Sequence, residues 1–155
     1  MAKSTFVYVS VIRTTPEKLW SALTDDGEFM KQYWFGSICE SQWKEGSAWK
    51  MTNSDGKVLV EGEIVEAIRP RLLVIRWTRD SKPDFADEVP SLCVMELEPV
   101  ASAVKLTITH SIEREPSRLI GEVSKGWPLI ISNLKSLLET GSVVLPEPCA
   151  AGAGG

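Results

Sequence analysis

The sequence predicts an α+β fold, in which an antiparallel sheet of about seven strands is followed by one long C-terminal helix. From about residue 37 to residue 112, apolar side chains recur at every second position, which is typical of half-buried strands. The breaks between these runs are short and carry turn residues, and short connections join antiparallel neighbours. Residues 117–141 instead place apolar side chains at steps of three and four, the spacing of an amphipathic helix.

The N-terminal elements are a strand and two short helices. Residues 5–12 are β-branched and aromatic, which predicts the first strand. Thr14 and Glu17 have the spacing of a capping box around Pro16, so we expect a helix to begin there. A second short helix follows the break at residues 24–27 and ends at Gly36.

Six further strands are expected between residues 37 and 112. Their ranges are 37–43, 48–52, 58–68, 72–78, 91–98 and 103–112. The exception to the short connections is a polar loop at 79–90 with two prolines. We expect its acidic residues to be solvated, and Glu61 and Glu63 to lie on the outer face of their strand because Val60, Gly62 and Ile64 have the opposite parity.

The terminal helix is expected to end at Gly141, a natural C′ residue. Pro128 lacks a backbone donor and disfavours helix at Trp127, so the sequence Gly126-Trp127-Pro128 predicts a kink or a restart. A single domain is thus expected over residues 1–141. Residues 142–155 cannot build a core of their own and are expected to be a disordered tail.

Composition excludes several classes of protein. The net charge is −4, which argues against a nucleic-acid binder. No apolar run is long enough for a membrane helix, and the N-terminus does not resemble a signal peptide, so a cytoplasmic location is expected without membrane contact. Cys39, Cys93 and Cys149 form no CxxC pair, which predicts free thiols rather than a disulfide framework or a metal site.

Four segments resemble one known family. They are PEKLWSALTDDGEFMKQYW, EGEIVEAIRPRLLVIRW, VKLTITHS and GWPLIISNLKSLLETG, and they occur in the family's order over residues 5–141. The family is the START-like (SRPBCC) superfamily, specifically the group similar to the C-terminal domain of the activator of heat-shock protein 90 ATPase. The resemblance implies a helix-grip fold, in which a curved sheet wraps around the terminal helix.

The same resemblance implies a cavity between sheet and helix. Co-chaperones of this name also carry an N-terminal domain that makes the main contact with the chaperone, whereas residue 5 already opens the first strand here. The family name therefore does not by itself imply chaperone activation.

Large apolar side chains are the candidates for lining such a cavity, with methionine supplying adaptability. Strand parity places Trp49 with Met51, and Trp77 and Met95 on inward faces of their strands. The candidate ligand-binding residues are Tyr33, Trp34, Trp49, Met51, Trp77, Met95, His110, Trp127 and Ile131, with Tyr33 and His110 as polar anchors. The alternative is that these side chains simply fill the core.

Three functions remain open. The first is a domain without assigned catalysis or cofactor that binds a small hydrophobic molecule. The second is a protein-interaction or stress-related chaperone-associated module, including a homodimer. The third is a cyclase- or hydrolase-like enzyme using His110, the only histidine, as acid or base.

Overall fold

A computed structural model describes residues 3–146 of the 155-residue chain. Seven strands form one sheet in the order β1-β7-β6-β5-β4-β3-β2, and every neighbouring pair is antiparallel. The strands are β1 (Ser4–Ile12), β2 (Ile38–Ser41), β3 (Ala48–Thr52), β4 (Val58–Ile68), β5 (Leu72–Asp80), β6 (Ser91–Val100) and β7 (Ala103–Ile112). The predicted fold class is confirmed.

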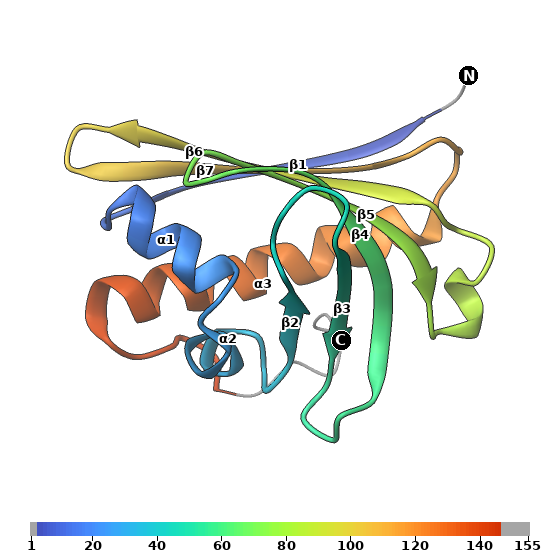
Figure 1. Ribbon diagram of the computed structural model, residues 1–155, viewed down its shortest axis with the longest axis horizontal. Helices are drawn as coiled ribbons and strands as arrows, with labels where there is room; N and C mark the ends of the chain where they lie inside the picture. The colour runs from blue at the N-terminus through green and yellow to red at the C-terminus, as the bar shows by residue number, and fades with distance from the viewer. Residues whose placement is uncertain (1–2, 147–155) are drawn as a thin grey trace.

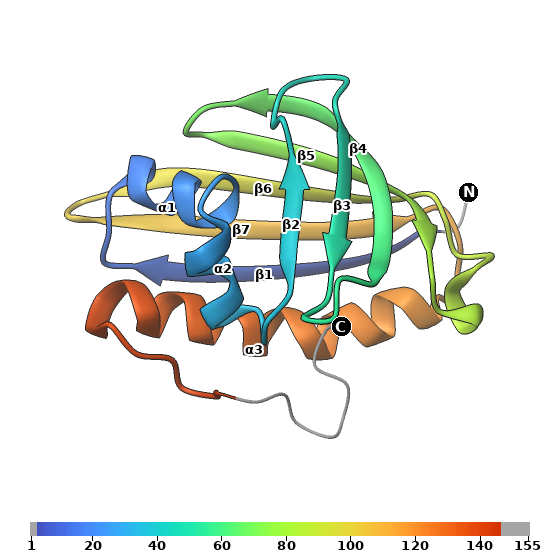
Figure 2. The same cartoon turned by 60° about the horizontal axis from the view of Figure 1, so that its bottom comes forward.

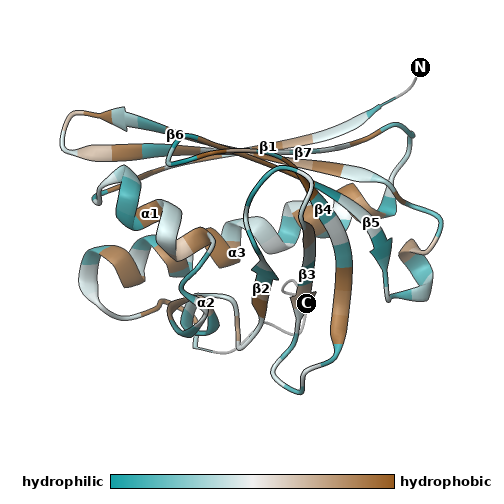
Figure 3. Cartoon of the chain, viewed as in Figure 1, coloured by the Kyte–Doolittle hydropathy of each residue, from teal (hydrophilic) through white to brown (hydrophobic). Residues whose placement is uncertain are grey.

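Three α-helices accompany the sheet: α1 (Pro16–Leu23), α2 (Gly27–Tyr33) and α3 (Arg118–Thr140). The sheet curves over α3, and α1 and α2 lie at one end of the concave side (Figures 1 and 2). A single 3₁₀ turn, η1 (Pro83–Phe85), interrupts the loop after β5. Hydrophobic and hydrophilic residues alternate along the strands and around α3, so that one core fills the space between them (Figure 3).

The curvature of the sheet coincides with irregular pairing of β4. The register between β3 and β4 shifts at Met51 and Thr52 of β3. The register between β4 and β5 shifts at two further places. At one of these shifts, a Cβ on Gly62 would lie 2.0 Å from the backbone oxygen of Arg76. Only glycine therefore allows the two strands to approach this closely.

The start of α1 differs from the predicted capping box. The cap is Thr15, whose Oγ1 accepts a hydrogen bond from the amide of Lys18 at 3.2 Å, and Thr14 lies outside the helix. Pro16 then takes the first helical position, where its missing N–H has no role.

Of the expected kink or restart in α3, the restart is wrong, since one uninterrupted helix runs through Pro128 to Thr140, and the kink stays a prediction. Packing of the apolar face on both sides of the proline outweighs the local penalty of about 3 kcal/mol. Gly141 ends the helix with φ of +87°, as predicted.

Residues 142–146 follow α3 and return to its side. Asn133, fully buried in α3, accepts hydrogen bonds from the amides of Val144 and Leu145 and donates one to the Leu145 carbonyl. This segment is therefore fixed against the helix by backbone groups, which side-chain composition does not reveal. The rest of the predicted tail, residues 147–155, lies outside the described residues.

Replacing Gly62 by alanine should destabilise the protein by about 1–3 kcal/mol or more, because the new methyl group collides with backbone rather than with a flexible side chain. The measurement is urea unfolding followed by circular dichroism. Gly27→Ala is the matched control, since its Cβ would meet only Ile38 Cγ2 at 4.0 Å. Equal stability of the two variants would contradict the account of β4.

Candidate ligand cavity

A cavity of about 60 Å³ lies between the first half of α3 and the far end of the sheet. Its walls come from the end of α2, from β3, β4 and β5, from η1 and from α3. The lining residues are Trp34, Met51, Leu59, Val60, Trp77, Asp80, Lys82, Phe85, Leu119, Glu122, Val123, Gly126, Trp127 and Ile130. Mainly apolar side chains line this partly open cavity, whereas a wider hollow outside β2–β5 is lined mainly by polar residues.

A second, smaller cavity of about 10 Å³ lies deeper in the core. It is lined by Leu23, Trp34, Cys39, Trp43, Trp49, Ile75, Trp77, Cys93, Met95 and Trp127. Trp34, Trp77 and Trp127 line both cavities. These three indoles therefore form the boundary between the outer and the inner space.

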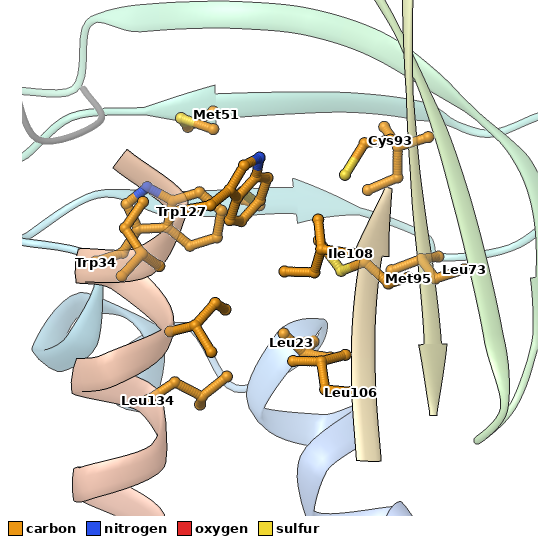
Figure 4. Packing of buried hydrophobic residues seen from close by; sticks show 14 of the residues in the cluster. Leu23, Trp34, Met51, Leu73, Cys93, Met95, Leu106, Ile108, Trp127 and Leu134 are labelled. Atoms are coloured by element: carbon orange, nitrogen blue, oxygen red, sulfur yellow. The ribbon is translucent and has the colours of Figure 1, made fainter. Parts of the chain in front are cut away.

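The aromatic rings around the two cavities contact one another in a chain. Trp34 meets Trp127 edge to face, with ring centroids 5.5 Å apart, and Trp49 stacks on Trp77 at 5.8 Å. The ring of His110 lies between the pairs, 4.5 Å from Trp77 and 6.3 Å from Trp127. Figure 4 shows Trp34 and Trp127 on the α3 side of the core, with Met51 above them and Cys93 and Met95 towards the sheet.

Three of these indoles carry buried N–H groups without an acceptor among the described residues. The Nε1 atoms of Trp34, Trp49 and Trp77 have no exposed surface and no hydrogen-bond partner within residues 3–146. An unsatisfied buried donor costs about 1–3 kcal/mol, and native proteins contain only a few. Three such donors in one aromatic cluster are therefore unusual.

The fourth indole of the cluster is satisfied. Trp127 Nε1 donates to His110 Nδ1 at 3.2 Å, and the other ring nitrogen, Nε2, lies 3.0 Å from Ser91 Oγ. Because an indole N–H can only donate, Nδ1 must accept, so Nε2 carries the proton and donates to Ser91. Burial lowers the pKa of His110 to about 3, so the ring is neutral at physiological pH.

This tautomer opposes the enzymatic hypothesis. A histidine acting as general base towards Ser91 needs a free nitrogen lone pair facing the hydroxyl, and here that nitrogen carries the proton. Both ring nitrogens are occupied, and the ring is fully buried. His110 therefore joins β7 to α3 rather than facing either cavity.

The mouth of the outer cavity is polar. Asp80, Lys82 and Glu122 line it, and the amide of Lys82 donates to Asp80 Oδ1 at 2.9 Å. Burial raises the pKa of Asp80, with this hydrogen bond acting in the opposite direction. Lys82 Nζ lies 5.8 Å from the ring centroid of Phe85, so its charge covers one wall of the entrance.

A buried carboxylate fastens this entrance loop to α3. Glu88 is 1% exposed and accepts hydrogen bonds from Ser117 Oγ at 2.6 Å and from the amides of Arg118 and Leu119. Burial raises the pKa of Glu88, but the hydrogen bonds from Ser117, Leu119 and Arg118 lower it further, so that its pKa lies below the ordinary value. The negative charge also meets the positive end of the helix dipole.

The structure gathers only part of the predicted site at one place. Trp34, Met51, Trp77 and Trp127 line the outer cavity, and Trp49 and Met95 line the inner one. Tyr33 instead donates its hydroxyl to the carbonyl of Ala22 at 2.7 Å, and Ile131 is buried away from both cavities. Their role in binding stays a prediction.

Sequence reasoning missed the entrance of the outer cavity. The loop at 79–90 reads as solvated, yet Phe85 and Glu88 are buried and Lys82 lines the cavity. The single aromatic residue of this polar loop is the signal that could have identified Phe85. Glu61 and Glu63 do lie half exposed on the outer face, paired with Arg79 and Arg76, as predicted.

The thiols of Cys39 and Cys93 are free and buried, as expected, while Cys149 lies outside the described residues. Burial raises the pKa of both, to about 12 for Cys93. Over residues 3–146, the structure groups no three potential metal ligands together. The α-helices of the same region include none long and apolar enough to cross a membrane, and the cytoplasmic location stays a prediction.

The curved sheet, the long helix and the mainly apolar cavity define a helix-grip domain of the START-like class. The family described as activator of Hsp90 ATPase homolog 1-like protein matches residues 13–139. The chain belongs to this family.

Solved structures agree with the fold. A Mesorhizobium loti protein is 23% identical with a TM-score of 0.75, covering 90% of this chain and 100% of its own. An Aha1 dimer from Colwellia psychrerythraea is 20% identical with a TM-score of 0.72, and the match covers 89% of this chain and 98% of that one. An HSP90 activator from Plasmodium falciparum is 22% identical with a TM-score of 0.69, and the match covers 86% of this chain and 95% of that one.

These identities show the fold alone, so contact with a chaperone stays a prediction. No curated protein matches the sequence.

The buried neutral His110 should make the protein sensitive to mild acid. Its folded-state pKa of about 3 lies below its ordinary value, so beneath pH 6.5 the unfolded chain binds a proton that the folded chain does not. The free energy of unfolding should therefore fall by about 2 kcal/mol between pH 7.5 and pH 5. Urea unfolding across this range measures it.

His110→Asn is the companion variant, because its side-chain oxygen can still accept from Trp127 Nε1. It should be less stable at neutral pH but should lose most of the pH dependence in this window. An unchanged slope in the variant would assign the acid sensitivity to other groups.

Proposed function

We propose that this protein binds a small hydrophobic molecule in the outer cavity between the sheet and α3. The observation that carries the proposal is a partly open, mainly apolar cavity whose boundary with the inner cavity consists of three tryptophans. Ligand sites are commonly concave, aromatic-lined and supplied with a few polar groups. The polar entrance beside Asp80 and Lys82 meets the last of these conditions.

The size of the cavity limits its occupant. At about 60 Å³ it is far smaller than the roughly 300–1,000 Å³ of common ligand pockets. A ligand larger than a few heavy atoms must therefore displace a wall. The short η1 segment with Phe85 and the indoles shared with the inner cavity are the walls whose movement would enlarge the space.

Gly126 supports a ligand-binding role for this part of α3. Glycine in a helix interior is less favourable than alanine by about 1 kcal/mol. Gly126 is buried and lines the cavity. The helix thus places an unfavourable residue in the wall of the cavity, where we expect a methyl group to reduce the open space.

Self-association is a second candidate function, favoured by the free edge of β1. This strand pairs with β7 alone, and Val7, Val9 and Val11 are 55%, 49% and 47% exposed. Lys135 Nζ binds the carbonyl of Val11, which therefore points away from β7. By strand periodicity, the backbone groups of Val7 and Val9 point to the same free edge and can pair with a second copy. The similar C. psychrerythraea protein is described as a dimer.

Ligand binding is tested by calorimetric titration with toluene, comparing Gly126→Ala with Gly121→Ala. Gly121 lies in the same helix, and an added Cβ there would meet nothing within 4 Å. Both variants gain helix propensity, about 0.5–1 kcal/mol. Only Gly126→Ala should weaken toluene binding, by about fivefold, because it fills the cavity.

Equal weakening by both alanine variants would show that toluene does not occupy this cavity. Absence of toluene binding, and of binding by any other small aromatic probe, to the unmodified protein would overturn the proposal.

Self-association is tested by sedimentation equilibrium of Val7→Pro. Proline removes an N–H that faces the free edge, so the β1–β7 ladder should survive while strand addition is blocked. We expect the unmodified protein to dimerise, Val7→Pro to be monomeric, and the control Val7→Thr to retain the dimer. A monomeric unmodified protein, or a dimeric Val7→Pro variant, would exclude pairing through this edge.

A further inference from the structure

We propose that the molecule bound in this cavity is an apolar, aromatic-sized compound carrying an oxygen hydrogen-bond acceptor, such as a ketone or quinone carbonyl. The indole N–H groups of Trp34 and Trp77 donate to that oxygen. The inference rests on the proposed ligand-binding function and specifies the chemistry of the ligand.

The position of the two indoles carries the argument. Trp34 and Trp77 are 5% and 7% exposed and line both the outer and the inner cavity. An indole nitrogen donates one hydrogen bond and cannot accept one. A ligand that opens the wall between the two cavities therefore gains access to two donors, because both Nε1 atoms are covered in the structure.

The surrounding wall offers little for a ligand donor to bind. Apart from the indole nitrogens, the heteroatoms in the side chains of the inner cavity are the sulfurs of Cys39, Cys93 and Met95, which are weak acceptors. The carboxylates of Asp80 and Glu122 belong to the lining of the outer cavity. The inner end of the site thus selects an acceptor, and an amine or an amide N–H placed there would lose its hydrogen bonds to water without replacement.

The described part of the protein does not supply the acceptor itself. Trp127 shows the contrast, because its N–H lies in the same cluster and is satisfied by His110. The Nε1 atoms of Trp34 and Trp77 are closed off by neighbouring side chains and meet no acceptor within residues 3–146. A ligand that displaces one of these neighbours gains the two donors, which offsets part of the work of opening the wall.

Specificity follows from a comparison of two probes of the same shape. Acetophenone and α-methylstyrene differ only in having C=O or C=CH₂ beside the ring. A purely apolar cavity favours the hydrocarbon, because it is the less soluble in water. We expect the opposite order, with acetophenone binding about tenfold more tightly by calorimetry, corresponding to the release of one unsatisfied donor.

Nuclear magnetic resonance of the indole N–H groups identifies the donors. In a ¹⁵N-labelled protein, the Nε1–H signals of Trp34 and Trp77 should move downfield with acetophenone but not with α-methylstyrene. The signal of Trp127, already bonded to His110, should move less. Single Trp→Phe variants assign the signals.

The same variants test the energetics, and a ratio of two affinities cancels any general change in cavity volume. In Trp34→Phe or Trp77→Phe, the preference for acetophenone should fall several-fold, because one of the two donors is removed. Trp20→Phe is the control, because Trp20 is buried but lines neither cavity, and it should keep the preference.

The outcomes separate the two proposals. If α-methylstyrene binds as tightly as acetophenone, or more tightly, the acceptor is not recognised and this inference is overturned, while hydrophobic binding stands. If neither these probes nor toluene bind, the proposed function fails as well. If the preference survives both Trp34→Phe and Trp77→Phe, other donors recognise the oxygen and the assignment to these residues is wrong.

Discussion

The hydrogen bond between Trp127 and His110 is the constraint on which the arrangement of the core depends. It connects the middle of α3 to β7, the neighbour of the edge strand β1, across a space otherwise filled by apolar contacts. By occupying Nδ1, it determines which histidine nitrogen carries the proton, and thereby the bond to Ser91 on β6. It also fixes one of the three indoles at the boundary between the cavities. His110, a candidate acid or base from the sequence, is therefore a structural residue of the core.

Two buried polar arrangements near the cavity differ in how completely they are satisfied. Glu88 receives hydrogen bonds at both carboxylate oxygens and holds the entrance loop on the first turn of α3. Trp34 and Trp77, which line the cavity, lack acceptors for their indole N–H groups among the described residues. Glu88 thus holds the entrance loop firmly on α3, whereas indole N–H groups in the wall of the cavity have no acceptor among the described residues. Natural proteins concentrate such local inconsistencies at functional sites.

Periodicity predicted the fold well because each strand has one buried face and the terminal helix has one apolar stripe. Trp77 and Met95 could be placed inward by parity alone, and Glu61 and Glu63 outward. Strand and helix periodicity predicts which face of an element is buried, but not how far apart two buried side chains lie. The sequence therefore groups Tyr33 and Ile131 with the residues that line the cavities, although neither lines them. The anchoring of Glu88 joins segments about thirty residues apart. Nothing local in the loop distinguishes it from Asp87, which remains exposed. Pro128 was misread for a related reason, since tertiary packing overrides local propensity.

The last turns of α3 hold the end of β1, because Lys135 binds the carbonyl of Val11 and Glu139 the amide of Arg13. The outward backbone groups that remain free along β1 therefore belong to Thr5, Val7 and Val9. An antiparallel, two-fold symmetric pairing that uses all three residues would have one register, with Val7 on the symmetry axis and Thr5 opposite Val9 of the other copy. In the proposed dimer, helix α3 would thus limit the sheet extension to about 17 Å of strand.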